Sequence, residues 1–298
     1  MASCNQLNAL ISPKSVAVIG ASPTPGSVGR AVFSNILLNG YQGIVYPINP
    51  SRKSILGVRC YPSILEVKDE IDLAVIIVRS DLVPQTLEQC GQAGVKCAVV
   101  ITAGFKEIGS KGAALEQEVV KAAKKNNICL IGPNCLGIFN TAQSVSLNAT
   151  FAKGMTKNGN IAFISQSGAL GIAAIEYARA EGIGLSKFFS VGNKADITEN
   201  ELLLLLKDDP ETKVILLYLE DIANHRDFID IAREITGEQR FPKPILAIKS
   251  GRTREGAKAV SSHTGSLAGS DTAYESVFEQ SGVIRVETME ELFNNAIA

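Results

Sequence analysis

Short runs of β-branched and aliphatic residues alternate with helical stretches along the first 135 residues. The runs are apolar throughout, which is typical of parallel strands covered on both faces. Alternation at this spacing predicts right-handed crossovers and an open parallel sheet of Rossmann-like type. We expect strands at 15–19, 43–48, 72–78, 95–102 and 127–131, with helices at 27–38, 81–92 and 112–125.

A second alternating series begins near residue 160, after a polar segment at 141–160 that we interpret as an inter-domain linker. This series predicts a flavodoxin-like parallel α/β domain, so the chain divides into two expected domains, 1–140 and 150–298. The last helix has no Gly or Pro stop, which is typical of a chain that continues. We expect strands at 160–164, 188–191, 213–219 and 244–249, with helices at 168–180, 199–206, 227–236, 272–280 and 288–296.

The composition of the chain excludes several classes of protein. The chain has 298 residues, a net charge of −1 and 46% hydrophobic residues. This excludes a disordered chain and removes the basic field expected of a protein that binds nucleic acid or an anionic membrane. The aliphatic runs are far shorter than the roughly 20 residues that cross a bilayer, and the N-terminus does not resemble a signal peptide. We therefore expect a cytoplasmic protein.

Cysteine and histidine usage argues against a metal site. Six cysteines occur, none in a CxxC pair, and there are two histidines, so we expect no zinc ribbon and no His-rich centre. All six cysteines precede residue 136, which indicates two halves of different composition.

A glycine-containing loop follows the first strand and precedes the first helix, where a dinucleotide fingerprint belongs. Five residues separate Gly20 from Gly26, so the spacing differs from GxGxxG. Backbone N–H groups at 26–29 still face an anion at a helix start. The alternative is a tight strand–helix turn without a ligand. The candidate residues of this loop are Gly20, Ala21, Ser22, Gly26, Ser27, Val28 and Gly29.

The end of the second strand indicates which nucleotide fits. Asn49 and Pro50 lead directly to the cations Arg52 and Lys53, and no acid stands there to bind ribose hydroxyls. A ribose that carries a phosphate fits better. NADP and coenzyme A both meet this condition.

Two segments of the second half share hydroxyls and glycines at expected helix starts. If both helix dipoles converge, they create a phosphate site. The first segment contains Ser165, Ser167, Gly168 and Ala169, and the second contains His263, Gly265 and Ser266.

His263 lies among small polar residues, which favours a phosphohistidine over an ordinary loop histidine. A nucleophilic imidazole needs an acceptor on its second nitrogen. Glu220 follows an expected strand and is our candidate partner, the alternative being a solvated acid pair with Asp221. His225 has charged neighbours and is expected to be solvated.

Together these motifs resemble the NDP-forming acyl-CoA synthetases, and more closely the α subunit of the ADP-forming acetyl-CoA synthetase branch than that of succinyl-CoA synthetase. The resemblance extends over almost the whole chain in the family's order. The matching stretches are VAVIGAS, GSVG, YPINP, ITAGF, IGPNCLG, FISQSGALG, SVGNKADI, LYLE and SGRTREGAKAVSSHTGSLAG.

The resemblance implies that the first domain binds CoA and that the second carries the phosphohistidine His263, oriented by Glu220. Phosphate would lie against Ser165, Ser167, Gly168, Ala169, Gly265 and Ser266. The phosphates of CoA would be bound by the glycine loop with Asn49, Pro50, Arg52 and Lys53, and its adenine side would contact Val78. The pantetheine arm would pass Ile101, Thr102, Ala103, Gly104 and Asn134, and its thiol would reach the turn that contains Cys135.

The implied reaction interconverts acyl-CoA, ADP and phosphate with acid, CoA and ATP, through an acyl phosphate and phosphohistidine. The sequence has no GxxxxGK[ST] P-loop and no ATP-grasp fold. The resemblance therefore implies an ATP-grasp β subunit or domain that binds ADP or ATP with Mg²⁺ in a heterotetramer-like assembly.

Three alternatives stay open at this point. One is a CoA-sensing module of the kind fused to protein acetyltransferases, and another is an NADP-binding oxidoreductase. The third is a succinyl-CoA synthetase α subunit, although Ile172 stands where those enzymes place a substrate-contacting tyrosine. The carboxylic acid and the choice between ADP and GDP are not determined by these residues.

Overall fold

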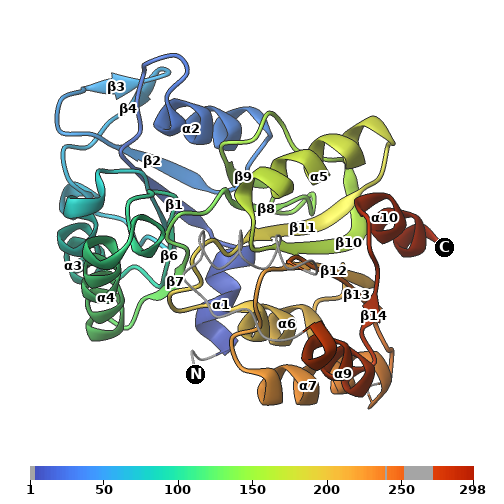
Figure 1. The fold of residues 1–298 in the computed structure, drawn as a ribbon. Coiled ribbons are helices and arrows are strands. Elements are labelled where there is room, and N and C mark those ends of the chain that lie inside the picture. Colours follow the sequence, from blue (N-terminus) through green and yellow to red (C-terminus); the bar gives the residue numbers. More distant parts are fainter. Residues whose placement is uncertain (1–3, 239, 252–270) are drawn as a thin grey trace.

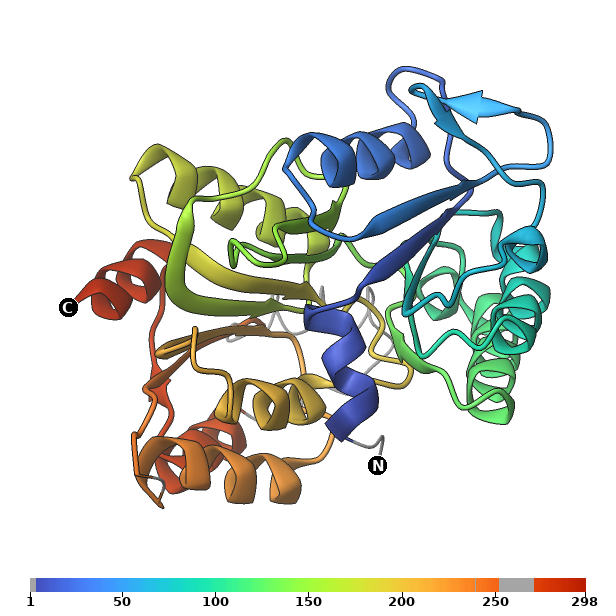
Figure 2. The ribbon, with the colours of Figure 1, turned by 180° about the vertical axis from the view of Figure 1, so that it is seen from behind.

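The computed structural model describes residues 4–238, 240–251 and 271–298. Two separate sheets lie side by side, each with helices on both faces, and helix α1 (Cys4–Ile11) lies between them (Figures 1 and 2). The expected α/β class is confirmed, whereas α1 was not expected from the sequence. No described helix is long and apolar enough to cross a membrane.

The first sheet is fully parallel, as predicted, with the order β2-β1-β5-β6-β7. Helices α3 and α4 cover one face, and α2 with α1 covers the other. A small β3–β4 hairpin extends from the end of β2. The elements are β1 (Ser15–Ile19), α2 (Val28–Leu38), β2 (Ile44–Ile48), β3 (Ser54–Ile55), β4 (Val58–Arg59), β5 (Leu73–Ile76), α3 (Val83–Gln92), β6 (Cys97–Val100), α4 (Ser110–Lys125) and β7 (Cys129–Ile131), with 3₁₀ turns at Ile64–Glu66, Ser80–Leu82 and Lys106–Ile108.

The second sheet has the order β14-β13-β12-β10-β11-β8-β9. Its first five strands are parallel, as in the flavodoxin-like prediction, and α5 and α10 cover one face while α6, α7 and α9 cover the other. The elements are β8 (Gly137–Asn140), β9 (Leu147–Thr150), β10 (Asn158–Ser165), α5 (Gly168–Ala180), β11 (Leu185–Ser190), α6 (Glu199–Lys207), β12 (Val214–Leu219), α7 (His225–Arg233), a π-helical turn (Glu234–Glu238), β13 (Ile245–Lys249), α9 (Asp271–Ser281), β14 (Ile284–Arg285) and α10 (Met289–Ile297).

The segment 141–160, interpreted as a linker, contains strand β9 and the first residues of β10. Strands β8 and β9 form an antiparallel hairpin that extends the second sheet, and β9 packs against α2 of the first half. Some of its polar residues are buried and form hydrogen bonds: Asn148 Oδ1 accepts from Thr150 Oγ1 at 2.8 Å, and Thr141 Oγ1 donates to Leu185 O at 2.6 Å. Strand β8 belongs to the second sheet although its residues fall within the first expected domain. The division into 1–140 and 150–298 stays a prediction.

The carboxyl ends of the two sheets meet through backbone hydrogen bonds. Beyond β11, the amides of Asn193, Ala195 and Ile197 donate to carbonyl groups of residues 130–133 at 2.9–3.0 Å. Gly192 makes this approach possible, since its φ is +54° and a Cβ there would lie 2.4 Å from the carbonyl oxygens of Pro133 and Asn134. Loops from both sheets therefore converge on one region.

A buried ion pair supports the strand that carries this loop. Lys187 lies inside β11, and its Nζ is 2.5 Å from Asp209 Oδ2, with side-chain exposures of 2% and 6%. Asp209 also accepts a hydrogen bond from Thr212 Oγ1. Removing one member of such a pair leaves the other charge buried and uncompensated.

We predict that Lys187→Met lowers the free energy of unfolding by about 3–5 kcal/mol, measured by urea denaturation. The control is Arg79→Met, which breaks an ion pair with Asp81 whose side chains are 76% and 59% exposed. This control should change the stability by less than about 1 kcal/mol. Equal effects of the two substitutions would contradict the prediction.

Candidate active site

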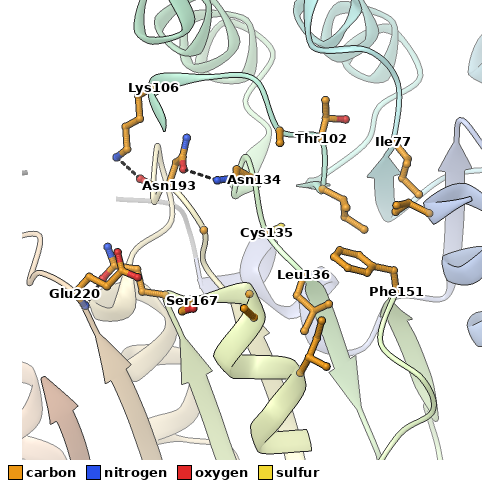
Figure 3. A pocket seen from close by; sticks show the side chains of 18 of the residues that line it. Ile77, Thr102, Lys106, Asn134, Cys135, Leu136, Phe151, Ser167, Asn193 and Glu220 are labelled. Carbon is orange, nitrogen blue, oxygen red and sulfur yellow. Dashed lines mark hydrogen bonds between the residues drawn. The ribbon is translucent and has the colours of Figure 1, made fainter. Parts of the chain in front are cut away.

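A cavity of about 610 Å³ lies where the two carboxyl edges meet. In each sheet the strand order reverses next to this place, between β1 and β5 and between β10 and β12, and ligands of open α/β sheets bind at such points. The side chains at one end, around Ile77 and Phe151, are apolar, whereas those at the other, around Lys106 and Glu220, are polar (Figure 3). The cavity therefore suits a ligand with an apolar part and an ionic part.

The glycine loop folds closely onto the end of β5. A Cβ on Gly20, whose φ is +95°, would lie 2.5 Å from Ile77 O, and a Cβ on Gly29 would lie 2.2 Å from Gly20 O. Ser27 caps α2, with its Oγ accepting from Arg30 N at 3.3 Å. Val28 alone of the seven predicted loop residues lines the cavity, and the other six shape or flank the turn: Gly20, Ala21, Ser22, Gly26, Ser27 and Gly29.

The second predicted CoA segment lies beside this loop but outside the cavity. Asn49 Nδ2 donates to Ala21 O at 2.8 Å, which joins the end of β2 to the glycine loop. Pro50, Arg52 and Lys53 are exposed next to the β3–β4 hairpin, and neither cation forms an ion pair with a described residue. The two positive charges are therefore available on the surface beyond the end of β2.

The loops after β5, β6 and β7 are tied together at the cavity wall. Thr102 Oγ1 donates to Val78 O at 2.7 Å, and Asn134 N donates to Thr102 O at 2.9 Å. Five of the six predicted pantetheine- and adenine-side residues in these loops line the cavity, namely Val78, Ile101, Thr102, Ala103 and Asn134. Gly104 lies just behind them, where its amide donates to Glu107 Oε1.

Cys135 lines the cavity with a thiol that is held in its protonated form. The residue is 4% exposed, and its Sγ donates to Val100 O at 3.3 Å. Burial raises the pKa of this thiol to about 12. Because the thiolate is the nucleophile, burial makes the Cys135 thiol a poor nucleophile at neutral pH.

The predicted phosphate segment forms the start of α5. Ser167 is the N-cap, and its Oγ accepts from Leu170 N at 3.3 Å. Ser167, Gly168 and Ala169 line the cavity, so the positive end of the helix dipole points toward it. Ser165 is fully buried, and its Oγ donates to Ser167 O, so this side chain shapes the turn.

Glu220 lies in the polar end of the cavity, 8% exposed, and a residue that the sequence did not single out holds it there. Gln166 Oε1 accepts from the backbone amides of Glu220 and Asp221 at 2.9 and 3.2 Å. Gln166 Nε2 donates to Asp221 Oδ1 at 3.0 Å. The side chain of Gln166 therefore joins the β10–α5 and β12–α7 loops. Its position between two predicted phosphate residues was the available signal.

A buried lysine joins the β12–α7 loop to the start of α6. Lys194 forms ion pairs with Asp221 and Glu199, and its Nζ also donates to Asp221 O at 3.0 Å. Burial alone would raise the pKa of Asp221, but the charge and hydrogen bond of Lys194 and the bond from Gln166 outweigh burial and lower it. Asp221 is therefore ionised and structural, which leaves Glu220 as the carboxylate that lines the cavity.

Lys106 and Asn193 also line the polar end, and neither was predicted. Lys106 Nζ donates to Asn193 O, as the dashed line in Figure 3 shows. Asn193 Nδ2 donates to Glu107 Oε2 and Glu116 Oε2, both at 2.7 Å. The pKa of Glu107 is lowered because the bond from Asn193 and the amides of its own loop outweigh burial.

The apolar end has two further residues that the sequence did not indicate. Phe151 and Leu136 both line it (Figure 3). Phe151 follows β9 in the segment interpreted as a linker, so its apolar side chain was not assigned to any face.

His263, Gly265 and Ser266 lie outside the described residues. The pairing of Glu220 with His263 and the second half of the phosphate site therefore stay predictions. The described residues contain no cluster of three potential metal ligands.

Two family models match the chain. A CoA binding domain matches residues 14–141, and a succinyl-CoA ligase like flavodoxin domain matches residues 158–298. These two segments correspond to the two sheets, except that β8, a strand of the second sheet, falls within the first segment and β9 lies between the segments.

Curated relatives are similar along nearly the whole chain. The 4-hydroxybutyrate–CoA ligase [ADP-forming] of Nitrosopumilus maritimus is 48% identical, over 97% of this chain and 41% of that protein. The acetate–CoA ligase [ADP-forming] I subunit alpha of Pyrococcus furiosus is 47% identical, over 98% of this chain and 63% of that protein. The chain thus spans about two fifths to three fifths of the length of such relatives.

A solved structure agrees with the sequence comparison. It is the dinucleotide forming acetyl-coenzyme A synthetase 1 of Ca. Korarchaeum cryptofilum in complex with phosphate and ADP, with a TM-score of 0.91 and 46% identity over 97% of this chain and 61% of that one. Matching sequence, fold and domain order lead to one conclusion: the chain belongs to the NDP-forming acyl-CoA synthetase superfamily and is of the α-subunit type found in its ADP-forming acetyl-CoA synthetase branch.

Proposed function

We propose that this chain is the CoA-binding and phosphohistidine-carrying part of an ADP-forming acyl-CoA ligase. The observation that carries the proposal is the single cavity that combines the loops of the CoA-binding sheet with the start of α5 and Glu220. The complete reaction converts acyl-CoA, ADP and phosphate into acid, CoA and ATP, and runs in either direction.

The chemistry proceeds as one acyl transfer and two phosphoryl transfers. A phosphate oxygen attacks the acyl carbonyl, the C–S bond breaks, and CoA leaves with an acyl phosphate remaining. A ring nitrogen of His263 then attacks phosphorus, the P–O bond breaks, and the carboxylate leaves. The phosphoryl group finally passes from His263 to ADP. The free energy of the thioester is thus kept in each intermediate.

Positioning and charge stabilisation carry most of this catalysis. The amides at the start of α5 supply partial positive charge to the transferring phosphoryl group. Glu220, fixed by the bonds of Gln166 to its backbone amide and to its neighbour, is placed to accept from the second imidazole nitrogen of His263 and to stabilise the imidazolium.

The last phosphoryl transfer requires a nucleotide site that we assign to an ATP-grasp β subunit or domain, with Mg²⁺ bound there. Relatives longer than this chain, and one whose name includes "subunit alpha", support a partner of this kind. A cytoplasmic location is part of the proposal, since Cys60, Cys90, Cys97, Cys129 and Cys135 are free thiols, which suits a reducing compartment.

We predict that the chain, given acetyl-CoA and ³²P-labelled phosphate, acquires an acid-labile, base-stable label. His263→Ala abolishes the label, because the nucleophilic nitrogen is lost. Glu220→Gln slows labelling by roughly 10²–10⁴-fold. His225→Ala, which removes the other histidine, an exposed residue at the start of α7, labels like wild type. Label of equal intensity in the His263→Ala variant overturns the assignment, and CoA binding with no label in any protein supports the sensing module instead.

Isothermal titration calorimetry tests which nucleotide the first domain binds. We expect CoA to bind and NADP not to bind. Replacing Arg52 and Lys53 by Ala should lower the affinity for CoA about tenfold, or about 1.4 kcal/mol, because their exposed charges face the 3′-phosphate. Dephospho-CoA lacks that phosphate, so its affinity should be the same for wild type and the double variant. A preference for NADP, or equal losses for both CoA forms, would count against the site.

Residue-resolved mass spectrometry tests the role of Cys135. Because burial raises the pKa of Cys135 to about 12, its thiol is protonated at pH 8. Iodoacetamide should therefore leave Cys135 unmodified in the folded chain at pH 8 and alkylate it after unfolding in urea. Cys135→Ser should retain phosphohistidine labelling. Rapid alkylation of the folded chain, or an acyl thioester on Cys135, would show that the thiol takes part in the chemistry.

A further inference from the structure

We propose that Lys106, a residue of the CoA-binding half, binds the phosphate that attacks the acyl-CoA. This inference rests on the proposed function and adds a substrate-contacting residue to it. Lys106 begins the 3₁₀ turn that follows the β6 loop, and it lines the same cavity as Gln166, Ser167 and Glu220. Its side chain extends from the first sheet toward the polar end of the cavity (Figure 3).

The ammonium group retains donors for a ligand. Lys106 Nζ donates one hydrogen bond, to Asn193 O at 2.5 Å, and Glu116 Oε1 is 4.0 Å away, beyond hydrogen-bond distance. A lysine ammonium has three N–H donors. The side chain is 33% exposed, so the group is reached from solvent through the cavity.

The neighbouring carboxylates are already engaged by other groups. Asn193 Nδ2 donates to both Glu107 and Glu116, and the amides of Gly104 and Phe105 donate to Glu107 at 2.5 and 3.0 Å. Lys106 therefore keeps its charge facing the cavity and does not collapse into a tight ion pair.

The charge of the cavity requires such a cation. Among the described residues that line it, Lys106 is the one cation and Glu220 the one carboxylate. Phosphate at neutral pH carries between one and two negative charges, and the start of α5 offers only about half a positive charge. Without Lys106, the described lining would place a phosphate beside Glu220 with a net repulsion.

The position of Lys106 is set by the contact between the sheets. Asn193 N donates to Pro133 O at 2.9 Å, so the carbonyl group that holds Lys106 is fixed to the first sheet. Ile101, Thr102 and Ala103, from the same loop as Lys106, line the part of the cavity assigned to the pantetheine arm. One loop thus contacts CoA through its first residues and phosphate through Lys106.

A merely structural lysine, one that only ties the sheets together, gives a different result from a phosphate ligand. If Lys106 only joins the two sheets, its loss lowers the stability of the fold and weakens the binding of both phosphate and acetyl-CoA. If Lys106 binds phosphate, its loss weakens the binding of phosphate alone. Lys106→Gln and Lys106→Met remove the charge, and Lys106→Arg keeps it. Lys111→Gln is the matched control, because Lys111 is an exposed lysine five residues further along that does not line the cavity.

The experiment measures binding of inorganic phosphate by ³¹P NMR titration, and release of CoA from acetyl-CoA at varied phosphate concentration. We expect Lys106→Gln and Lys106→Met to raise the Kd and the KM for phosphate at least tenfold, with the KM for acetyl-CoA changed less than twofold. Lys106→Arg should recover most of the phosphate affinity, and Lys111→Gln should match wild type.

The inference is overturned if both charge-removing variants bind phosphate as wild type does, or if the affinities for phosphate and for acetyl-CoA fall equally. Failure of the proposed function has a separate signature: wild type releases no CoA when phosphate is added. In that case the NMR titration still decides whether Lys106 binds phosphate.

Discussion

The close backbone contact between residues 192–197 and the exit of β7 is the constraint on which the site depends. Each sheet alone presents half of a ligand site at its carboxyl edge, and the contact brings the two edges to one cavity. Main-chain hydrogen bonds make much of the contact, and the side chain of Asp196 adds one from Leu130 N at 2.9 Å. At Gly192 the carbonyl oxygens of Pro133 and Asn134 leave no room for a Cβ. The geometry between the halves is therefore set before any ligand is bound.

A continuous set of polar interactions extends from this contact to the proposed chemistry. Asn193 holds Lys106 and two glutamates of the first half, and the next residue, Lys194, holds Asp221. Gln166 then connects Asp221 and Glu220 to the start of α5. Each buried charge in this set has a partner, which is the condition under which buried charges are tolerated. Rigid placement of Glu220 and of the α5 amides follows, and preorganisation of this kind is what phosphoryl transfer needs.

The parts of the fold set by local pattern were predictable, and the parts set by partners distant in sequence were not. The apolar run of β1, the glycine loop and the serine-rich start of α5 each follow from neighbouring residues. Lys187 inside β11, by contrast, is explained only by Asp209, and the polar hairpin β8–β9 only by bonds to the rest of the sheet and to α1. Phe151 and Lys106 enter the cavity from loops whose direction is decided by packing between the halves, so no periodicity in the chain indicates them.

The near-zero net charge is consistent with how this chain would handle anions. CoA and phosphate are both strongly negative, yet a general basic field would attract nucleic acids as well. In the arrangement proposed here, two exposed cations follow β2, and a third lines the same cavity as the start of α5. In this proposal each of the two anion sites combines a lysine or arginine charge with the partial positive charge of a helix start. The distance between the two sites would then decide which ligands fit. A fitting ligand would place its phosphates at the first site and its reactive group at the start of α5. An acyl-CoA meets this condition, with free phosphate as the second reactant, whereas a simple polyanion does not.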